Sequence, residues 1–225
     1  MKSLFVTTVA ALALATSGTV ASVAAAKPVA GKKHYVVLWN QNSNFGGGVN
    51  SQQYESAMQE YDDYAADDFV VPEGQRWFIS EVDVTGTYTG GSGPATSVLV
   101  IFYHDDNGIP GKIGDGDHDF FTLKCKDDAG SFQCVLPTAH HNKPVVKFGP
   151  GIWWVSVSAN CDSGTCGHWN WTENTNVTGN QAEWENPGGA WDIRACYGWN
   201  VISTCFGGAP ADLAFELIGL SQPLK

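Results

Sequence analysis

Seven of the nine tryptophans lie between Trp153 and Trp199, in a stretch rich in glycine and asparagine. A tryptophan ring needs a packing surface and a partner for its indole N–H. Two arrangements meet both needs: the rings form the core of a disulfide-bonded sheet domain, or some of them stack on sugar rings whose hydroxyls bind nearby amides. In the second arrangement the ligand-binding candidates are Trp169, Trp171, Trp184 and Trp191.

Acidic side chains in the same stretch are the candidates for catalysis. Glycoside hydrolysis needs two carboxylates at a set separation, and Glu173, Glu183 and Glu185 are the residues that would supply them. The sequence contains no G-x-S-x-G, no H-E-x-x-H and no phosphate-binding glycine loop. We therefore predict no catalytic residue, and a carbohydrate-active hydrolase that uses two of these glutamates is the alternative.

Alternating acids between Asp115 and Asp119 resemble a calcium-binding loop, because calcium prefers carboxylate and amide oxygens. Phe120 and Lys126, however, stand where an EF-hand needs glycine and glutamate. We predict a solvated acidic turn and no cofactor, with a looser structural calcium site as the alternative. No C-x-x-C pair exists, so zinc is disfavoured as well.

The six cysteines permit fifteen pairings. Their spacing favours disulfides between sequence neighbours, with Asp128 to Gly130 as the tip of a hairpin inside the first pair. The predicted pairs are Cys125 with Cys134, Cys161 with Cys166, and Cys196 with Cys205. Disulfides persist in oxidising compartments.

The N-terminus has the features of a secretory signal peptide over residues 1–26. Lys2 is followed by a short apolar run at residues 4–15, and an A-x-A-like site ends at Ala26. The run is too short to span a bilayer. Residues 27–34 are basic and predicted to be a mobile leader. We expect an exported protein, extracellular or periplasmic, with no membrane span after cleavage.

Charge and length narrow the class further. The chain has 225 residues and a net charge of −11, which repels phosphate backbones and anionic membranes. Nucleic acid is therefore not an expected partner. The mature length suits one core, so residues 35–220 are predicted to form a single domain. The oligomeric state is left open.

The pattern of elements indicates an all-β protein. Short apolar or alternating runs recur between Gly-, Pro- and Asn-rich turns, with no long amphipathic helix. The predicted strands are residues 35–39, 77–86, 97–103, 120–125, 133–136, 151–159, 169–172 and 211–219. The alternation slips by one residue at Ser80-Glu81, which predicts a β-bulge. Residues 40–53 are predicted to be a polar loop.

Strand geometry also assigns faces to the rings. Trp153 and Trp154 are adjacent, so they must point to opposite faces of their strand. Trp169 and Trp171 share one face, and His168 and Asn170 share the other. The whole pattern favours a jelly-roll-like antiparallel β-sandwich with long disulfide-stapled loops.

Two motifs carry a family resemblance. Residues 65–74 are A-A-D-D-F-V-V-P-E-G, followed by Trp77, and residues 149–157 are G-P-G-I-W-W-V-S-V. They resemble a family of secreted bacterial β-sandwich domains without an assigned activity, and the likeness extends over residues 37–219. The resemblance implies a jelly-roll-like, non-catalytic domain.

These observations together predict a secreted, non-catalytic binding or surface-interaction module. A glycan or polysaccharide is the expected ligand class, because aromatic rings crowd in polar loops without a catalytic set. The alternatives are the carbohydrate-active hydrolase and a purely structural envelope or matrix protein in which every tryptophan belongs to the core.

Overall fold

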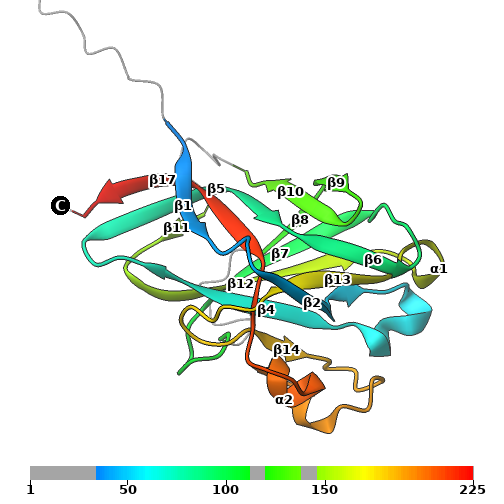
Figure 1. The fold of residues 1–225 in the computed structure, drawn as a ribbon. Helices are drawn as coiled ribbons and strands as arrows, with labels where there is room; N and C mark the ends of the chain where they lie inside the picture. Colours follow the sequence, from blue (N-terminus) through cyan, green and yellow to red (C-terminus); the bar gives the residue numbers. More distant parts are fainter. Residues whose placement is uncertain (1–33, 112–119, 138–145, 225) are drawn as a thin grey trace, which may run out of the picture. The chain divides into compact units, whose positions relative to one another are not determined.

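The computed structural model describes residues 34–111, 120–137 and 146–224. The predicted signal peptide, the leader up to residue 33 and the acidic turn at Asp115 to Asp119 lie outside the described residues. The strands of the described part form three sheets, and most neighbouring strands are antiparallel (Figure 1). The predicted all-β, sandwich-type architecture is thus confirmed.

The first sheet has the order β1-β17-β5-β10-β9, with β11 also paired to β5. Its strands are β1 (Val36–Asn40), β17 (Phe215–Pro223), β5 (Gln75–Val84), β10 (Ser131–Val135), β9 (Lys126–Asp128) and β11 (Lys147–Phe148).

The second sheet has the order β15-β14-β4-β12-β7-β8, and β3 runs parallel to β12. Its strands are β15 (Asn200–Val201), β14 (Glu183–Glu185), β4 (Tyr64–Val71), β12 (Gly151–Asn160), β7 (Ser97–His104), β8 (Phe120–Leu123) and β3 (Gln52–Gln53).

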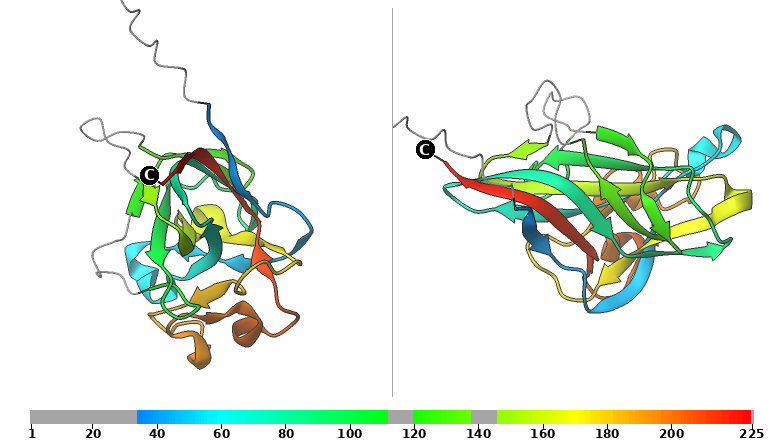
Figure 2. Two further views of the ribbon diagram at one scale, coloured as in Figure 1. Left: turned by 90° about the vertical axis from the view of Figure 1, so that its left-hand side faces the viewer. Right: turned by 90° about the horizontal axis from the view of Figure 1, so that it is seen from above.

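The third sheet has the order β16-β13-β2, with β6 also paired to β13. Its strands are β16 (Asp212–Leu213), β13 (Gly167–Asn174), β2 (Phe45–Asn50) and β6 (Gly86–Gly90). The helices are short: 3-10 helices η1 (Ser56–Tyr61) and η2 (Arg194–Cys196), and α-helices α1 (Ser163–Cys166) and α2 (Ile202–Phe206). The left-hand view of Figure 2 shows α2 close to β14, and the two elements are in contact.

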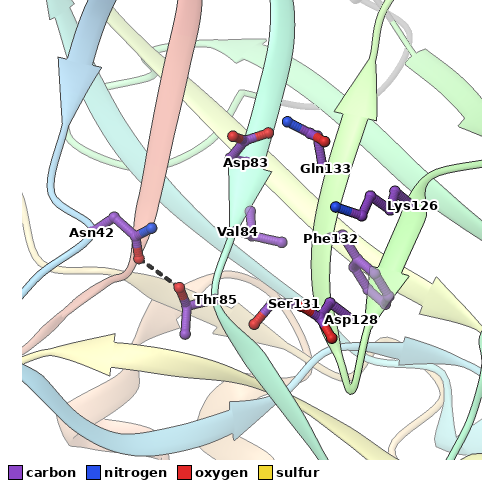
Figure 3. Close-up of a pocket in the computed structure, with 9 residues that line it drawn as sticks. All are labelled: Asn42, Asp83, Val84, Thr85, Lys126, Asp128, Ser131, Phe132 and Gln133. Atoms are coloured by element: carbon purple, nitrogen blue, oxygen red, sulfur yellow. Dashed lines mark hydrogen bonds between the residues drawn. The ribbon is translucent and has the colours of Figure 1, made fainter.

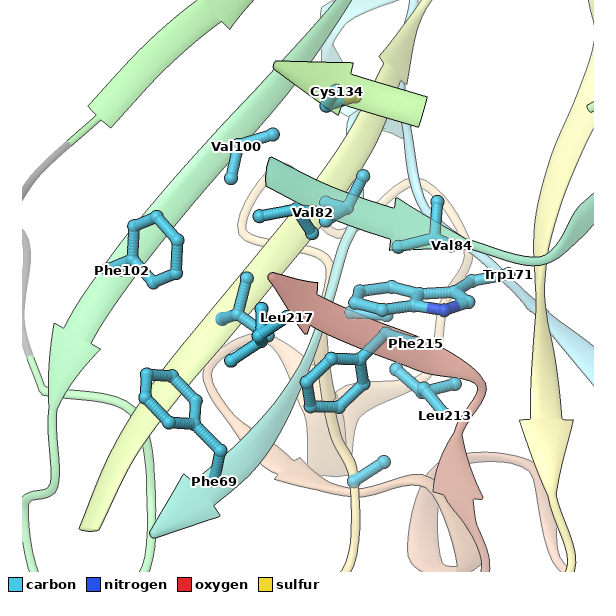
Figure 4. Close-up of a cluster of buried hydrophobic side chains, with 14 of the residues drawn as sticks. Phe69, Val82, Val84, Val100, Phe102, Cys134, Trp171, Leu213, Phe215 and Leu217 are labelled. Atoms are coloured by element: carbon cyan, nitrogen blue, oxygen red, sulfur yellow. The ribbon is translucent and has the colours of Figure 1, made fainter. Parts of the chain in front are cut away.

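One face of each sheet contributes to a shared core (Figure 4). Leu217 of the first sheet, Phe69 and Val100 of the second and Trp171 of the third are buried in one cluster. Alternate side chains along a strand point to opposite faces, so the apolar positions of these strands all meet in this core. The sandwich prediction rests on that alternation.

The outer face of the second sheet carries a smaller buried cluster that includes Tyr103 and Trp154. Trp153, by contrast, packs against the main core. The two adjacent rings therefore occupy opposite faces, as strand geometry predicts.

The predicted bulge lies in β5. Glu81 pairs with Ile218 of β17 and Ile79 pairs with Gly219, so Ser80 is the extra residue. Its hydroxyl donates a hydrogen bond to the Ile218 carbonyl at 3.1 Å. The slip of alternation in the sequence thus corresponds to a real irregularity in the strand pairing.

All three predicted disulfides are present, and no cysteine is free. The Cys125–Cys134 bond closes the β9–β10 hairpin, whose turn residues Ala129 and Gly130 have φ of 53° and 101°. Positive φ at both turn positions is the geometry of a type I′ hairpin turn.

Several boundaries differ from the sequence prediction. The predicted strand 77–86 ends at Val84 in β5, and Gly86 begins β6 of another sheet. Residues 40–53 are not one loop, because β2 and β3 lie within them. A Cβ on Gly48 would lie 3.0 Å from the Cβ of Asn170 on β13, so glycine permits this close pairing. The predicted strand 211–219 is divided at Ala214: β16 pairs with β13, whereas β17 pairs with β5.

Candidate functional site

A row of polar side chains crosses the outer face of the third sheet. Trp169 and Trp171 of β13 point into the core, so His168 and Asn170 point outward. His168 pairs with Thr89 of β6, and Asn170 pairs with Asn50 of β2. Strand register therefore brings an imidazole, a hydroxyl and two amides together.

A pocket of about 250 Å³ lies over this row. Besides the four polar residues, it is lined by Gly48, Val49, Trp191 and Phe206. Within the described part of the chain, no Lys, Arg, Asp or Glu lines this pocket. We call it the Trp191 pocket. It combines two aromatic rings with uncharged hydrogen-bonding groups.

Trp191 is held in place at the pocket by backbone and ring contacts. Its indole N–H donates to the Tyr61 carbonyl at 2.9 Å, and its backbone N–H donates to Asn186 Oδ1 at 3.1 Å. The Trp191 ring lies 5.6 Å from the rings of Tyr61 and of His168, in edge-on geometry. Because both N–H groups are satisfied by protein acceptors, the ring is preorganised.

Phe206, at the end of α2, is the second aromatic wall, and the sequence analysis missed it. Its side chain is 50% exposed, and its ring packs edge-on against Trp184 at 4.8 Å. The preceding residue, Cys205, is bonded to Cys196. The available signal was a large apolar residue between a cysteine and Gly207-Gly208.

His168 belongs to a hydrogen-bonded group that extends beneath the pocket. Its Nδ1 lies 2.7 Å from the Tyr54 hydroxyl, which accepts a hydrogen bond from Asn50 Nδ2 at 2.8 Å. Asn50 Nδ2 also donates to Asp63 Oδ2. Burial, with a smaller contribution from Asp63, raises the pKa of Tyr54 above its usual range, so its hydroxyl keeps its proton.

Three of the four predicted ligand-binding rings are corrected by the structure. Trp169 and Trp171 are 0% exposed and Trp184 is 1% exposed. Their indole N–H groups donate to the carbonyls of Gly130, Ala214 and Asn50, respectively. Rings of this burial cannot stack on a ligand, because their faces contact the core. Of the predicted four, Trp191 alone lines the pocket, and Trp184 supports Phe206 from behind.

The three glutamates of the hydrolase alternative lie on two sheets, with one on β13 of the third sheet and two on β14 of the second. Glu173 of β13 accepts a hydrogen bond from the Gly47 N–H at 3.0 Å, where the pairing with β2 is irregular. Glu183 and Glu185 share one face of β14, since Trp184 between them faces the core. Burial raises the pKa of Glu183 to about 8 and that of Glu185 to about 7.

A second pocket, of about 240 Å³, lies on the outer face of the first sheet (Figure 3). Register aligns Asp83 of β5 with Gln133 of β10 and Lys126 of β9. Burial and Glu81 raise the pKa of Asp83 to about 6, and Lys126 opposes the shift. The one aromatic residue in its lining, Phe132, belongs to the main core. The Trp191 pocket is therefore the better site for a ligand with apolar faces.

Two observations on the described residues concern metal ions and membrane spans. In the parts of the chain that the structure describes, no group of three or more His, Cys, Asp or Glu side chains is placed to hold a metal ion. The loop at Asp115 to Asp119 lies outside those parts, so the calcium alternative stays a prediction. Among the described helices, none has the length and apolar character needed to cross a membrane.

Comparisons with known proteins give one distant structural likeness. No protein-family model and no curated protein matches the chain. A solved structure, that of the cysteine protease and lectin-like domains of Cwp84, a surface layer associated protein of Clostridium difficile, aligns with a TM-score of 0.44 and 12% identity. The alignment covers 72% of this chain and 32% of that chain. A likeness at this level carries no conclusion about activity or ligand.

Proposed function

We propose that this protein is an exported, non-catalytic binding module that holds a sugar unit of a glycan or polysaccharide in the Trp191 pocket. The observation that carries the proposal is the flanking of an uncharged polar row by Trp191 and Phe206. Sugar rings have apolar C–H faces and polar edges, and this pocket offers both kinds of partner. The three disulfides support the exported location, since such bonds persist in oxidising compartments.

The rigidity of the pocket supports binding without large rearrangement. Its walls come from three strands, from Trp191, which hydrogen bonds to Tyr61 and Asn186 hold in place, and from Phe206, which directly follows the Cys196–Cys205 bond. A preformed site loses less conformational freedom on binding than a flexible one, and affinity rises accordingly.

Retention on insoluble polysaccharides tests the proposal. The purified protein is incubated with cellulose, xylan, chitin and starch granules, and the bound fraction is measured by sedimentation. We expect retention on at least one of them, and we expect Phe206→Ala to weaken it by about tenfold, since aromatic anchors dominate binding energy. Failure of the wild-type protein to bind any neutral glycan, there or on a glycan array, would contradict the proposal.

The chain offers matched controls. Phe45 of β2 is 57% exposed, close to the 50% of Phe206, and does not line the pocket. Phe45→Ala should leave retention unchanged. For the polar row, Thr89→Val should weaken binding, whereas Thr87→Val on the same face of β6 should not. Equal losses in both members of either pair would point to general destabilisation instead of a lost contact.

A further inference from the structure

Beneath the Trp191 pocket, the number of protons on each side chain determines which partner donates in each hydrogen bond. The Asn50 amide has two N–H bonds, and they point to the two acceptors already described, Asp63 Oδ2 and the Tyr54 hydroxyl. The other Asp63 oxygen accepts the Gln52 N–H at 2.8 Å. Burial raises the pKa of Asp63 well above its usual range, and in the ionised form its Oδ2 also accepts. Asn50 therefore acts as the donor at this end of the group.

The Tyr54 hydroxyl is the next group, and it donates its hydrogen bond to His168. It accepts from Asn50, and it carries a single proton of its own. That proton lies on the bond to His168 Nδ1, 2.7 Å away. A neutral imidazole whose Nδ1 accepts has its proton on Nε2. His168, which lines the pocket, then presents an Nε2–H donor on the side of the ring away from Tyr54.

The same arrangement leaves an acceptor without a partner. Asn50 Oδ1 is buried and has no hydrogen-bond partner among the described residues. Asn50 lines the pocket beside His168. Because this oxygen is shielded from solvent, its missing hydrogen bond is a cost of holding the Asn50 amide as the donor to Tyr54 and Asp63.

We propose that Asp63, Asn50 and Tyr54 act as positioning residues that fix His168 as an Nε2–H donor in a pocket without a counter-charge, so that the pocket selects uncharged sugar hydroxyls over anionic groups. A sugar hydroxyl accepts from this Nε2–H without bringing a charge into the pocket. A carboxylate or sulfate would bring a negative charge that no cationic side chain among the described lining residues neutralises. This inference rests on the proposed function and names the ligand class for it.

Charge around the site acts in the same direction. Among the described residues, no lysine or arginine lines the pocket to neutralise an anion. The chain as a whole carries a net charge of −11. Uronic acid and sulfated glycans are therefore disfavoured at close range by the lack of a counter-charge and at long range by repulsion.

We call the chain of hydrogen bonds from Asp63 through Asn50 and Tyr54 to His168 the relay. In the competing arrangement, every hydrogen bond of the relay runs in the opposite direction. It requires a proton on Asp63 that donates to a rotated Asn50 amide, after which Tyr54 donates to Asn50 and accepts from His168 Nδ1–H. His168 would then present a bare Nε2 acceptor. The two arrangements place the imidazole proton on different nitrogens, so a measurement of the tautomer separates them.

Long-range ¹H–¹⁵N NMR of the ligand-free protein at pH 7.5 measures the tautomer, with His168→Gln identifying the signals. We expect the Nε2–H form for His168 in the wild type. We expect Tyr54→Phe, which removes the hydroxyl, to give a mixture of tautomers, while Tyr64→Phe on β4 leaves the signal unchanged. An Nδ1–H form or an imidazolium in the wild type would overturn the relay.

The binding arm compares a neutral polysaccharide that retains the protein with polygalacturonate. We expect the wild-type protein to bind polygalacturonate at least tenfold more weakly than the neutral polysaccharide. We expect Tyr54→Phe to bind the neutral polysaccharide about tenfold more weakly than the wild type does. Equal or tighter binding to polygalacturonate would overturn the selectivity. The Nε2–H tautomer without binding to any glycan would leave the relay intact and contradict the proposed function alone, so the two failures are distinguishable.

Discussion

At the scale of single residues, the role of a side chain depends on the face of the strand from which it points. Trp169 and Trp171 are core residues because their positions on β13 face inward, while His168 and Asn170, which alternate with them, reach the pocket. Trp191 reaches the same pocket from a connection outside the sheets. Residue type therefore indicated that aromatic rings matter, and orientation decided which of them is accessible.

Gly86 of β6 tests the packing of the buried tryptophans. A Cβ at this position would lie 2.7 Å from the Trp169 indole ring. We expect Gly86→Ala to lower the free energy of unfolding by about 1–3 kcal/mol, the usual cost of overpacking, in urea denaturation followed by tryptophan fluorescence. Gly149→Ala is the control, because nothing lies within 4 Å of its Cβ. A tolerated Gly86→Ala would contradict the rigid placement of Trp169.

Glu183 makes stability depend on pH. Burial raises its pKa from 4.5 to about 8 in the folded protein, so the folded state holds this proton more tightly than the unfolded state. The free energy of unfolding therefore falls as pH rises from about 4.5 through 8. We expect Glu183→Gln, which keeps the shape and removes the charge, to raise Tm at pH 9 and to change it little at pH 5. A change in Tm of equal size at both pH values would contradict a burial effect on this carboxyl.

At the scale of elements, a disulfide bond holds two very short helices in position. η2 and α2 have three and five residues, too few to be stable alone. The Cys196–Cys205 bond joins them and holds Phe206 against Trp184. Binding should therefore depend on this disulfide more than on the others.

Two double cysteine variants separate stability from positioning. The Cys125–Cys134 and Cys196–Cys205 bonds both join residues nine apart. Replacing either pair with alanine should lower the free energy of unfolding by roughly 2–3 kcal/mol, measured in guanidinium chloride. Only the Cys196→Ala, Cys205→Ala protein should also lose polysaccharide retention, measured well below its Tm. Equal retention by both variants would contradict the positioning role.

At the scale of the whole molecule, the acidic charge and the full set of disulfides describe a protein suited to an oxidising exterior. The chain has 23 acidic and 12 basic residues, and a negative net charge of this size favours solubility and repels polyanions. Apolar residues of all three sheets meet in one core.

Export can be checked on the mature chain. We expect the secreted protein to begin at Lys27, and its intact mass to be lower than that of the reduced chain by two hydrogens for each of the three disulfides. Maleimide should label no thiol before reduction, because no cysteine is free. A chain that stays in the cytoplasm with residues 1–26 attached would contradict the predicted signal peptide.

Local patterns in the sequence determined much of the fold. Apolar and alternating runs predicted most of the long strands, the slip at Ser80 predicted the bulge, and short spacing predicted the three disulfides. These features depend on neighbours a few residues away, so they can be deduced from order alone. The opposite faces of Trp153 and Trp154 follow from the same rule.

Tertiary structure decided what lies at the pocket. Phe206, Thr89, Asn50 and His168 come from segments far apart in the sequence, and only the pairing of β13 with β2 and β6 brings three of them together. The same pairing buried Trp169 and Trp171, which sequence analysis had placed at a ligand surface. The tryptophan-rich stretch is thus mainly a core with one ring at the pocket, because exposure depends on long-range packing that no local pattern contains.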